Sequence, residues 1–485
     1  MPRFLSRLIL LPPALALLFT LASAAETRSL LVLHTNDLHD HVRAGQGRAG
    51  GLPYIAGYVA QERAKRNDIL LLDAGDVTEK GDMVAFASQS RVTYAAMGRM
   101  KYDAAVPGNH DFSLGMEHLE ACRALLGGAA YLCINCDDAA GKPRWEASHV
   151  FEVNGLRVGV IGATVETDKG NTLDLEATAG RIAEEAARLD KDCHLLIVLA
   201  HLGLVDCRAL AGKVPSVDVF VGGHTHELLR EPVRTESGAI IVQTGNYAER
   251  VGSIDLAVDT ETHTAKLVKG GVVEMRHDTI PPDDSMLAWV RAEEQRLCPE
   301  ASRVVGRADA TVSEGDMARI AAAAFREKAG TDAGFCHPLQ IMRSALPAGE
   351  VDVNALFLTG GQRGSTLVTA KLRGSEIEAY LAGLYRARKG VTVWSGFTAE
   401  VSAAGVAGDL DAGRIYTIVM PEAEWTGRFL KLWNKDAGAP PAATPSGTSF
   451  TEALADYIER GAKEGKSVNQ LAASTGAGKI ARAGR

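Results

Sequence analysis

Seven short apolar runs recur between residues 29 and 260, and nearly all of them end in glycine or polar residues. The runs read LLVLHTND, ILLLDAGD, DAAVPGNHD, LRVGVIGAT, HLLIVLAHLG, VDVFVGGHTH and AIIVQTGN, with helical stretches between them. This alternation favours a layered α/β core over an all-α or all-β one. Because loops at the carboxyl ends of strands line the ligand crevice of an open α/β sheet, we expect these polar ends to converge.

The chain is too long for one compact core, with 485 residues of which 46% are hydrophobic. We predict a first domain over residues 27–276 and a connecting helix or hinge over 277–304. A smaller α+β domain is expected over 305–470, where runs such as STLVTAKLRG alternate with helices. The small, basic residues of 471–485 predict a disordered tail.

The first 24 residues have the pattern of a signal peptide. Arg3 and Arg7 precede the apolar stretch LILLPPALALLFTLASA, which ends in small residues suited to signal peptidase. No other segment approaches the ~20 apolar residues of a membrane span. We therefore expect a periplasmic or secreted protein, with cleavage near Ala24.

The charge and the cysteines limit the possible functions. A net charge of −8 argues against binding to a nucleic-acid polymer, but it still allows a small anionic substrate, which one local cationic site could bind. We expect a small-molecule substrate, and we expect the protein to be a monomer. Seven cysteines in an exported chain permit disulfides, although their connectivity cannot be deduced. For Cys133 and Cys136 we favour a structural bridge or two buried thiols over redox chemistry.

The polar strand ends supply many side chains that can bind metals. One buried histidine alone is more often a hydrogen-bonded core residue, and one aspartate after a strand is more often a turn former. Five separate strand ends, however, offer oxygen and imidazole donors together. The candidates are Asp37, His39, Asp76, Asn109, His110, His201, His224 and His226.

The stretches NDLHDH, LLDAGDV, VPGNHDF, LAHLG, GGHTHE and TGNYAERVGSIDL occur in this order over residues 30 to 257. In this the chain resembles the calcineurin-like metallophosphatases, and within them the exported bifunctional 5′-nucleotidases that also act as UDP-sugar hydrolases and 2′,3′-cyclic phosphodiesterases. The resemblance implies a four-layer α/β/β/α sandwich as the metallophosphatase domain, followed by a smaller α+β C-terminal domain. It also implies a metal-dependent phosphoric ester hydrolase.

The resemblance assigns the ligands of two divalent metals. It implies that one metal is held by Asp37, His39 and His226, the second by Asn109, His201 and His224, and that Asp76 bridges them. Two such ions activate a water and clamp phosphoryl oxygens during in-line attack. Imidazole and oxygen ligands without thiolate suit Zn, Mn, Co or Fe.

The stretch HTNDLHDH contains both ligands and other polar residues. We expect Asp37 and His39 to alternate along extended backbone, so that both point toward the metal. His34 is expected to be structural. Asp40 and His41 are expected to face solvent or to support the ligands from behind.

His110 matches the catalytic histidine of the family, which stabilises charge on the phosphoryl group or protonates the leaving oxygen. Many family members orient this imidazole with an aspartate three residues later, whereas this chain has Ser113. Asp111 would lie on a different side of an extended segment. We therefore predict that His110 has a weaker orienting contact and a lower imidazole pKa than in relatives that have the aspartate.

The C-terminal part is similar to the nucleotide-binding domain of the same group, but less closely. A segment that is glycine-rich in relatives reads CHPLQIMR and retains Arg343 as a substrate contact, and GGQRGST introduces Arg363. Phe397 matches the first of two rings that clamp the base, with Trp394 nearby. Phe450 is the candidate for the second ring. For all five residues, a solvated arginine or a core aromatic is the competing interpretation.

Three functions fit the sequence. The first is an exported hydrolase of nucleotide phosphoesters, which the complete ligand set and His110 favour. The second is a thiosulfohydrolase on the same scaffold, since such enzymes resemble this family and also have a divergent C-terminal domain. The third is a metal-binding or ligand-binding relative without turnover, to which Ser113 and the missing glycines point.

Overall fold

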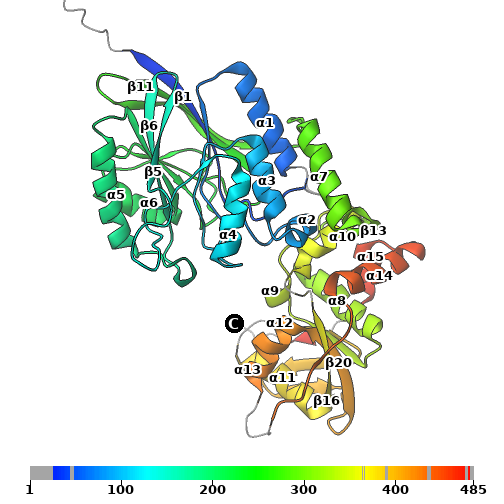
Figure 1. The fold of residues 1–485 in the computed structure, drawn as a ribbon. Helices are drawn as coiled ribbons and strands as arrows, with labels where there is room; N and C mark the ends of the chain where they lie inside the picture. Colours follow the sequence, from blue (N-terminus) through cyan, green and yellow to red (C-terminus); the bar gives the residue numbers. More distant parts are fainter. Residues whose placement is uncertain are drawn as a thin grey trace, which may run out of the picture.

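The computed structural model describes residues 26–43, 49–362, 364, 366–387, 392–433, 439–475 and 479–480. The predicted signal peptide lies outside the described residues. Two lobes follow one another along the chain, and the larger N-terminal lobe holds two mixed sheets (Figure 1). Within the described ranges, no helix combines the length and apolar character that crossing a membrane requires.

The first sheet of the N-terminal domain has the strand order β12-β11-β1-β2-β3-β4. Its strands are β1 (Thr27–Thr35), β2 (Ile69–Asp73), β3 (Ala104–Ala105), β4 (Ala130–Tyr131), β11 (Arg250–Asp259) and β12 (Ala265–Glu274). Strands β1 to β4 run parallel, while β11 and β12 are antiparallel additions. The carboxyl ends of β1, β2 and β3 therefore share one edge.

The second sheet repeats this design with the order β5-β6-β7-β8-β10-β9. Its strands are β5 (Ser148–Val153), β6 (Leu156–Thr164), β7 (Leu195–His201), β8 (Val219–Gly222), β9 (Val233–Arg234) and β10 (Ile240–Val242). Strands β6, β7, β8 and β10 are parallel and almost entirely apolar, as expected for strands buried on both faces.

Three apolar clusters show that the domain has four layers. One cluster fills the space between the sheets and includes Val32 and Leu72 from the first sheet and Ile197 and Val221 from the second. The others lie under the helices on the outer faces. These helices are α1 (Leu52–Lys65), α3 (Arg91–Met100) and α4 (Met116–Arg123) on one side, and α5 (Leu175–Leu189) and α6 (Gly203–Lys213) on the other (Figure 1). The predicted α/β/β/α sandwich is confirmed.

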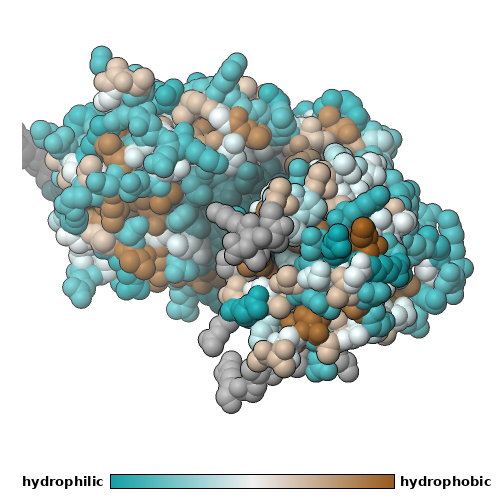
Figure 2. Space-filling view, turned by 90° about the horizontal axis from the view of Figure 1, so that it is seen from below, coloured by the Kyte–Doolittle hydropathy of each residue, from teal (hydrophilic) through white to brown (hydrophobic). Residues whose placement is uncertain are grey.

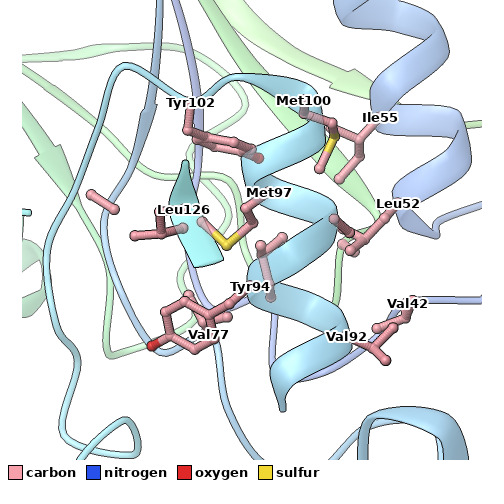
Figure 3. Packing of buried hydrophobic residues seen from close by; sticks show 14 of the residues in the cluster. Val42, Leu52, Ile55, Val77, Val92, Tyr94, Met97, Met100, Tyr102 and Leu126 are labelled. Atoms are coloured by element: carbon pink, nitrogen blue, oxygen red, sulfur yellow. The ribbon is translucent and has the colours of Figure 1, made fainter. Parts of the chain in front are cut away.

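Helix α3 lies at the centre of the outer cluster beside α1. Tyr94 and Met97 on α3 lie near Val77, which comes from the loop after β2, and Leu52 of α1 closes the other side (Figure 3). Because Val77 is buried in this cluster, the polar loop that contains Asp76 is attached to the hydrophobic core.

The C-terminal domain is α+β, as predicted. Its five-stranded sheet is accompanied by a two-stranded and a three-stranded sheet. The strands are β13 (Val304–Ala308), β14 (Ala333–Cys336), β15 (Gly349–Asp352), β16 (Leu367–Arg373), β17 (Val393–Ser395), β18 (Ala399–Ser402), β19 (Gly405–Gly408), β20 (Ile415–Pro421), β21 (Thr444–Pro445) and β22 (Lys479–Ile480). The helices are α8 (Glu314–Ala329), α9 (Pro338–Ile341), α10 (Val353–Leu356), α11 (Gly374–Arg386), α12 (Glu422–Glu424), α13 (Leu430–Leu432), α14 (Phe450–Lys463) and α15 (Val468–Ser474).

The end of the chain differs from the predicted tail. Helix α15 continues through Ser474, so the first four residues of the range 471–485 are helical. Ser467 caps the helix by accepting from Gln470, and Leu471 is buried against the core of the domain. This capping and burial explain why these residues are ordered, although their composition suggested a tail.

Helix α7 (Asp284–Leu297) connects the two domains and packs on the first of them. Its side chains Met286 and Val290 belong to the same apolar cluster as α1 and α3. The Asp283 side chain caps the helix by accepting from the Met286 N–H. The predicted connector is therefore a helix that shares the core of the N-terminal domain.

A buried polar contact joins the domains near α2 (Met83–Ala87). Asn354 of the C-terminal domain donates to Asp82 Oδ1 over 2.8 Å and accepts from the Met83 N–H over 2.8 Å. Arg43 reaches Asp352 over 3.0 Å and also pairs with Glu294 on α7. The two lobes are thus joined by side chains that satisfy one another across the interface.

Asn354→Ala is expected to lower the free energy of unfolding by about 1–3 kcal/mol, because it leaves buried polar partners unsatisfied at Asp82 and Met83. Chemical denaturation monitored by fluorescence measures this loss. Asn469→Ala is the matched control, because Asn469 makes similar hydrogen bonds to residues 309 and 310 at an exposed site of the C-terminal domain. An equal loss in both variants would contradict a special role for the interface.

The seven cysteines all lie in described residues, and all are buried and unpaired. Cys133 Sγ donates to Asn135 Oδ1 over 3.3 Å, and Cys136 Sγ donates to the Gly170 carbonyl over 2.9 Å. Of the two alternatives for this pair, the structure has the buried thiols.

Candidate metal centre and active site

The predicted ligands meet where the two sheets present the carboxyl ends of their parallel strands. The loops after β1, β2 and β3 come from the first sheet, and β7 and the loop after β8 come from the second. Two groups of side chains have ligand atoms close enough to hold an ion each, and they are Asp37, His39 and His226 in one group and Asp76, His201 and His224 in the other.

In the first group, imidazoles face a carboxylate and each other. His226 Nε2 lies 3.2 Å and His39 Nε2 lies 3.8 Å from Asp37 Oδ1. The two Nε2 atoms are 3.0 Å apart. This separation is compatible with both nitrogens binding one ion at the ~2.0–2.1 Å typical of zinc–imidazole bonds.

In the second group, Asp76 and Asn109 supply the oxygens. His201 Nε2 lies 3.3 Å from Asp76 Oδ2. Asn109 Oδ1 lies 2.9 Å from His224 Nδ1 and 3.4 Å from His201 Nε2. Asp76 Oδ2 is also 3.7 Å from His39 Nε2 of the first group, so its carboxylate lies between the two groups.

Hydrogen bonds behind the histidines orient their lone pairs toward these oxygens. His39 Nδ1–H donates to the Thr78 carbonyl over 3.0 Å, and His201 Nδ1–H donates to the Ala74 carbonyl over 2.7 Å. Each Nε2 then faces a carboxylate, and two acceptors repel one another unless a proton or a metal lies between them. Backbone carbonyls that fix the tautomer in this way are typical of metal-binding histidines. The donor set therefore fits two divalent cations.

Burial and neighbouring charges shift the pKa values of the site residues in opposite directions. Burial lowers the pKa of His39 to about 3, so this imidazole is neutral and able to bind a metal. Burial also lowers the pKa of His201, but the charge and hydrogen bond of Asp76 outweigh it and raise it to about 9. Burial opposes ionisation of Asp76, yet its histidine neighbours lower its pKa overall. A cation bound here would replace the proton on His201.

The backbone conformation of Asp37 and His39 is not extended, as had been predicted, but left-handed. Strand β1 ends at Thr35, and Asp37 and His39 have φ values of 50° and 46°, in the left-handed region. Asp76, His224 and His226 have positive φ as well. Such conformations cost roughly 1 kcal/mol or more for residues with a Cβ and are concentrated at functional sites. Asp37 and His39 therefore converge through a tight loop and not through strand alternation.

Asp111 organises the loops that position Asp76. Its buried carboxylate accepts from four backbone N–H groups at distances of 2.7–3.1 Å, those of Asp76, Val77, Thr78 and Gly108. Burial and the charge of Asp76 raise the pKa of Asp111 to about 6. A Cβ on Gly108 would lie 2.1 Å from Asp76 Oδ1, so only glycine allows this approach. This role of Asp111 was not predicted from the sequence.

The other polar residues of HTNDLHDH have supporting roles. His34 is buried and has no hydrogen-bond partner among the described residues, in agreement with a structural role. Asp40 does not face solvent: its carboxylate accepts from Glu79 N–H and Ser90 Oγ–H, each over 2.7 Å. His41 Nδ1 donates to the His39 carbonyl, and its ring stacks on Tyr247 at 4.3 Å.

His110 lies beside the two groups, and the predicted weak orienting contact is not observed, because a carboxylate contacts its ring. Its ring packs edge-on against His39 with 5.1 Å between centroids. Its Nδ1–H donates to Glu79 Oε2 over 2.6 Å. Burial raises the pKa of Glu79, but hydrogen bonds from His110 and Ser113 lower it overall, which keeps this carboxylate ionised. Residues 79 and 110 are far apart in sequence, so no local pattern indicated this contact.

Arg343 reaches the site from the C-terminal domain. A cavity of about 250 Å³ between the domains is lined by Arg343 together with Lys80, Tyr247 and His41. Lys80 Nζ lies 3.1 Å from His39 Nε2, which connects this cavity to the first group. Burial and the positive charge of Arg343 lower the pKa of Lys80. Lys80 and Tyr247 were not among the residues predicted from the sequence. Seen from below, a recess with a hydrophilic floor separates the lobes (Figure 2).

The aromatic candidates are arranged differently from a ring clamp. Phe397 is partly buried and stacks on Trp394 at 5.7 Å. Trp394 is 1% exposed and Phe450 is 0% exposed, so both are core residues in this structure. Phe450 packs on Phe325 because helix α14 turns its first residue inward. Phe450 as the second clamp ring is therefore wrong, and Arg363 lies outside the described residues.

Two family models each match one of the two domains of this chain. A calcineurin-like phosphoesterase model matches residues 30–228, and a model of the 5′-nucleotidase C-terminal domain matches residues 296–422. The Bacillus subtilis Endonuclease YhcR is 27% identical over 58% of this chain, which spans 26% of YhcR. A Vibrio cholerae 5′-nucleotidase is 24% identical, with 90% of this chain and 91% of that protein covered.

Among solved structures, a 5′-nucleotidase precursor from Thermus thermophilus is similar in fold. The TM-score is 0.64 with 23% identity, and the match covers 89% of this chain and 96% of that one. At this identity the likeness concerns the fold. The first curated relative extends well beyond the matched region, since the chain spans about a quarter of its length.

Proposed function

Because the chain belongs to the calcineurin-like phosphoesterase family and has a 5′-nucleotidase C-terminal domain, we propose that it is an exported hydrolase of nucleotide phosphoesters with two divalent metal ions. The single observation that carries the proposal is the position of Asp76. Its carboxylate lies between two sets of imidazole and oxygen donors, with His110 beside them.

In this proposal, each residue has a defined role. Asp37, His39 and His226 would hold one ion, and Asn109, His201 and His224 the other, with Asp76 shared between them. When bound, such ions supply a hydroxide at neutral pH and neutralise phosphoryl charge. His110 exchanges a proton with the leaving oxygen through Nε2, since its Nδ1–H is held by Glu79.

The C-terminal domain would hold the rest of the substrate. Arg343 offers a planar guanidinium to a phosphate or a sugar hydroxyl in the cavity between the domains. Phe397, half-buried on Trp394, is the proposed base contact. Export is proposed from the apolar N-terminal stretch, and periplasmic fractionation tests it independently of activity.

The test of the proposed function is phosphate release by the purified mature protein loaded with Mn or Zn. AMP, a nucleotide sugar, a 2′,3′-cyclic nucleotide and bis-p-nitrophenyl phosphate are the substrates. We expect turnover of at least one, lost on chelation and restored by metal. Two bound metals without turnover of any substrate would contradict the proposal and favour the thiosulfohydrolase or the non-catalytic alternative.

Arg343→Ala is expected to raise KM for a nucleotide about tenfold, which corresponds to ~1.4 kcal/mol of lost binding, and to change kcat much less. The reason is that Arg343 belongs to the substrate cavity and not to the metal groups. Steady-state kinetics measure both constants. Arg307→Ala, on strand β13, is the control and should leave KM unchanged. An unaltered KM in Arg343→Ala would remove this residue from the substrate site.

A further inference from the structure

We infer that Glu79 positions the imidazole of His110, in the place of the aspartate that many relatives have three residues after this histidine. The inference rests on the proposed function, because it gives His110 a role in phosphoester hydrolysis. In this chain that nearby position is Ser113, which has no carboxylate.

The hydrogen bond between His110 and Glu79 is short, and His110 is its donor. The ionised carboxylate of Glu79 can only accept, so His110 Nδ1–H donates to Glu79 Oε2 over 2.6 Å. Ser113 also makes a side-chain hydrogen bond to the Glu79 carboxylate. The serine therefore supports the carboxylate that replaces the aspartate, and two donors fix the position of Glu79.

The backbone holds Glu79 in place from two sides. Its N–H donates to Asp40 Oδ2 over 2.7 Å, and its φ of 68° turns the chain sharply at this residue. The preceding residue, Thr78, donates through its hydroxyl to the His110 carbonyl over 2.8 Å. The carboxylate and the imidazole thus belong to segments that are hydrogen-bonded to each other, which limits their relative motion.

The consequence for His110 is a fixed tautomer and a fixed ring plane. With its proton on Nδ1 held by Glu79, the ring leaves Nε2 free for proton exchange with substrate. Edge-on packing against His39 keeps that ring next to the predicted metal ligands. Correct orientation within fractions of an ångström is what a general acid or base needs.

The alternative is that Glu79 forms an ion pair with His110 that only stabilises the loop after β2. This alternative predicts lower stability in Glu79 variants without any specific effect on His110. A carboxylate supplied from position 113 would then have no reason to restore activity.

The experiment compares Glu79→Ala, Glu79→Gln, the double variant E79A/S113D and the pair H110A and E79A/H110A, with metal content verified in each. We expect Glu79→Ala to lower kcat about 10–100-fold with KM changed less than about twofold. Glu79→Gln should fall between, since its amide oxygen still accepts. E79A/S113D should regain activity, and E79A should cost nothing further in H110A. Glu117→Ala, an exposed glutamate on α4, is the control for general effects.

Three results would overturn the inference: an unchanged kcat in Glu79→Ala, no recovery in E79A/S113D, or an equal loss in the H110A background. If the wild-type protein hydrolyses none of the substrates, the proposed function fails and the positioning role is measured directly. The imidazole nitrogens of His110 are then observed by ¹⁵N NMR. We expect the Nδ1–H tautomer in the wild type and its loss in Glu79→Ala, and an unchanged tautomer contradicts the inference.

Discussion

Replacing Asp76 with alanine is expected to lower kcat at least about 1000-fold and to reduce the bound metal below two ions per chain. The carboxylate lies 3.3 Å from His201 Nε2 and 3.7 Å from His39 Nε2, and it also accepts from the His110 N–H over 2.8 Å. In the proposed metal centre, its removal would leave the imidazoles of both groups without a shared oxygen ligand. Elemental analysis of dialysed protein and phosphate-release assays measure the two effects.

His149→Ala is the matched control for a metal-capable side chain outside the two groups. His149 lies on β5, with a side chain that is 46% exposed and paired with Glu146. Its removal should change neither metal content nor kcat. Two ions bound to Asp76→Ala with normal turnover would contradict the proposed dinuclear centre.

Asp111→Ala is expected to lower the free energy of unfolding of the metal-free protein by about 3–5 kcal/mol. Four backbone N–H groups lose their common acceptor. Because the loop that positions Asp76 is buried, water replaces the Asp111 carboxylate poorly as an acceptor. Denaturant unfolding in the presence of a chelator separates this loss from any effect of metal. Activity should fall as well, because the Asp76 carboxylate is no longer held.

Asp138→Ala provides the comparison for Asp111→Ala. Asp138 also accepts from backbone N–H groups, those of Ala140 and Lys142, but in an exposed turn. Its loss should stay below about 1 kcal/mol, since solvent satisfies those groups. A similar cost in both variants would show that burial of Asp111 is not the reason for its importance.

Much of the candidate site was predictable because each proposed ligand lies at or just after a strand end. Apolar runs define the strands, and parallel strands place their carboxyl ends at one edge, so Asp37, Asp76 and His201 had to lie near one another once the sheet order was right. The local geometry was not predictable. The left-handed conformations of Asp37 and His39 depend on hydrogen bonds to the loop after β2, such as Asp37 N–H to the Gly75 carbonyl over 2.8 Å.

The same limit applied to the aromatic residues of the second domain. A phenylalanine near the start of a strand or helix has the same sequence context whether its ring faces a ligand or the core. Phe450, the first residue of α14, is fully buried and packs on Phe325, while Phe397 remains partly exposed and stacks on Trp394. Only the packing of α14 against the neighbouring elements separates the two cases.

By itself, the sequence determined the layered α/β class, the two domains and the identity of the side chains that can bind metals, because these depend on local periodicity and composition. Tertiary structure alone decided that Glu79 holds His110, that Asp111 holds the Asp76 loop, and that Lys80 and Arg343 line one cavity. Those contacts join residues far apart in the chain. Their distances follow from how the sheets and domains pack together, which no local pattern contains.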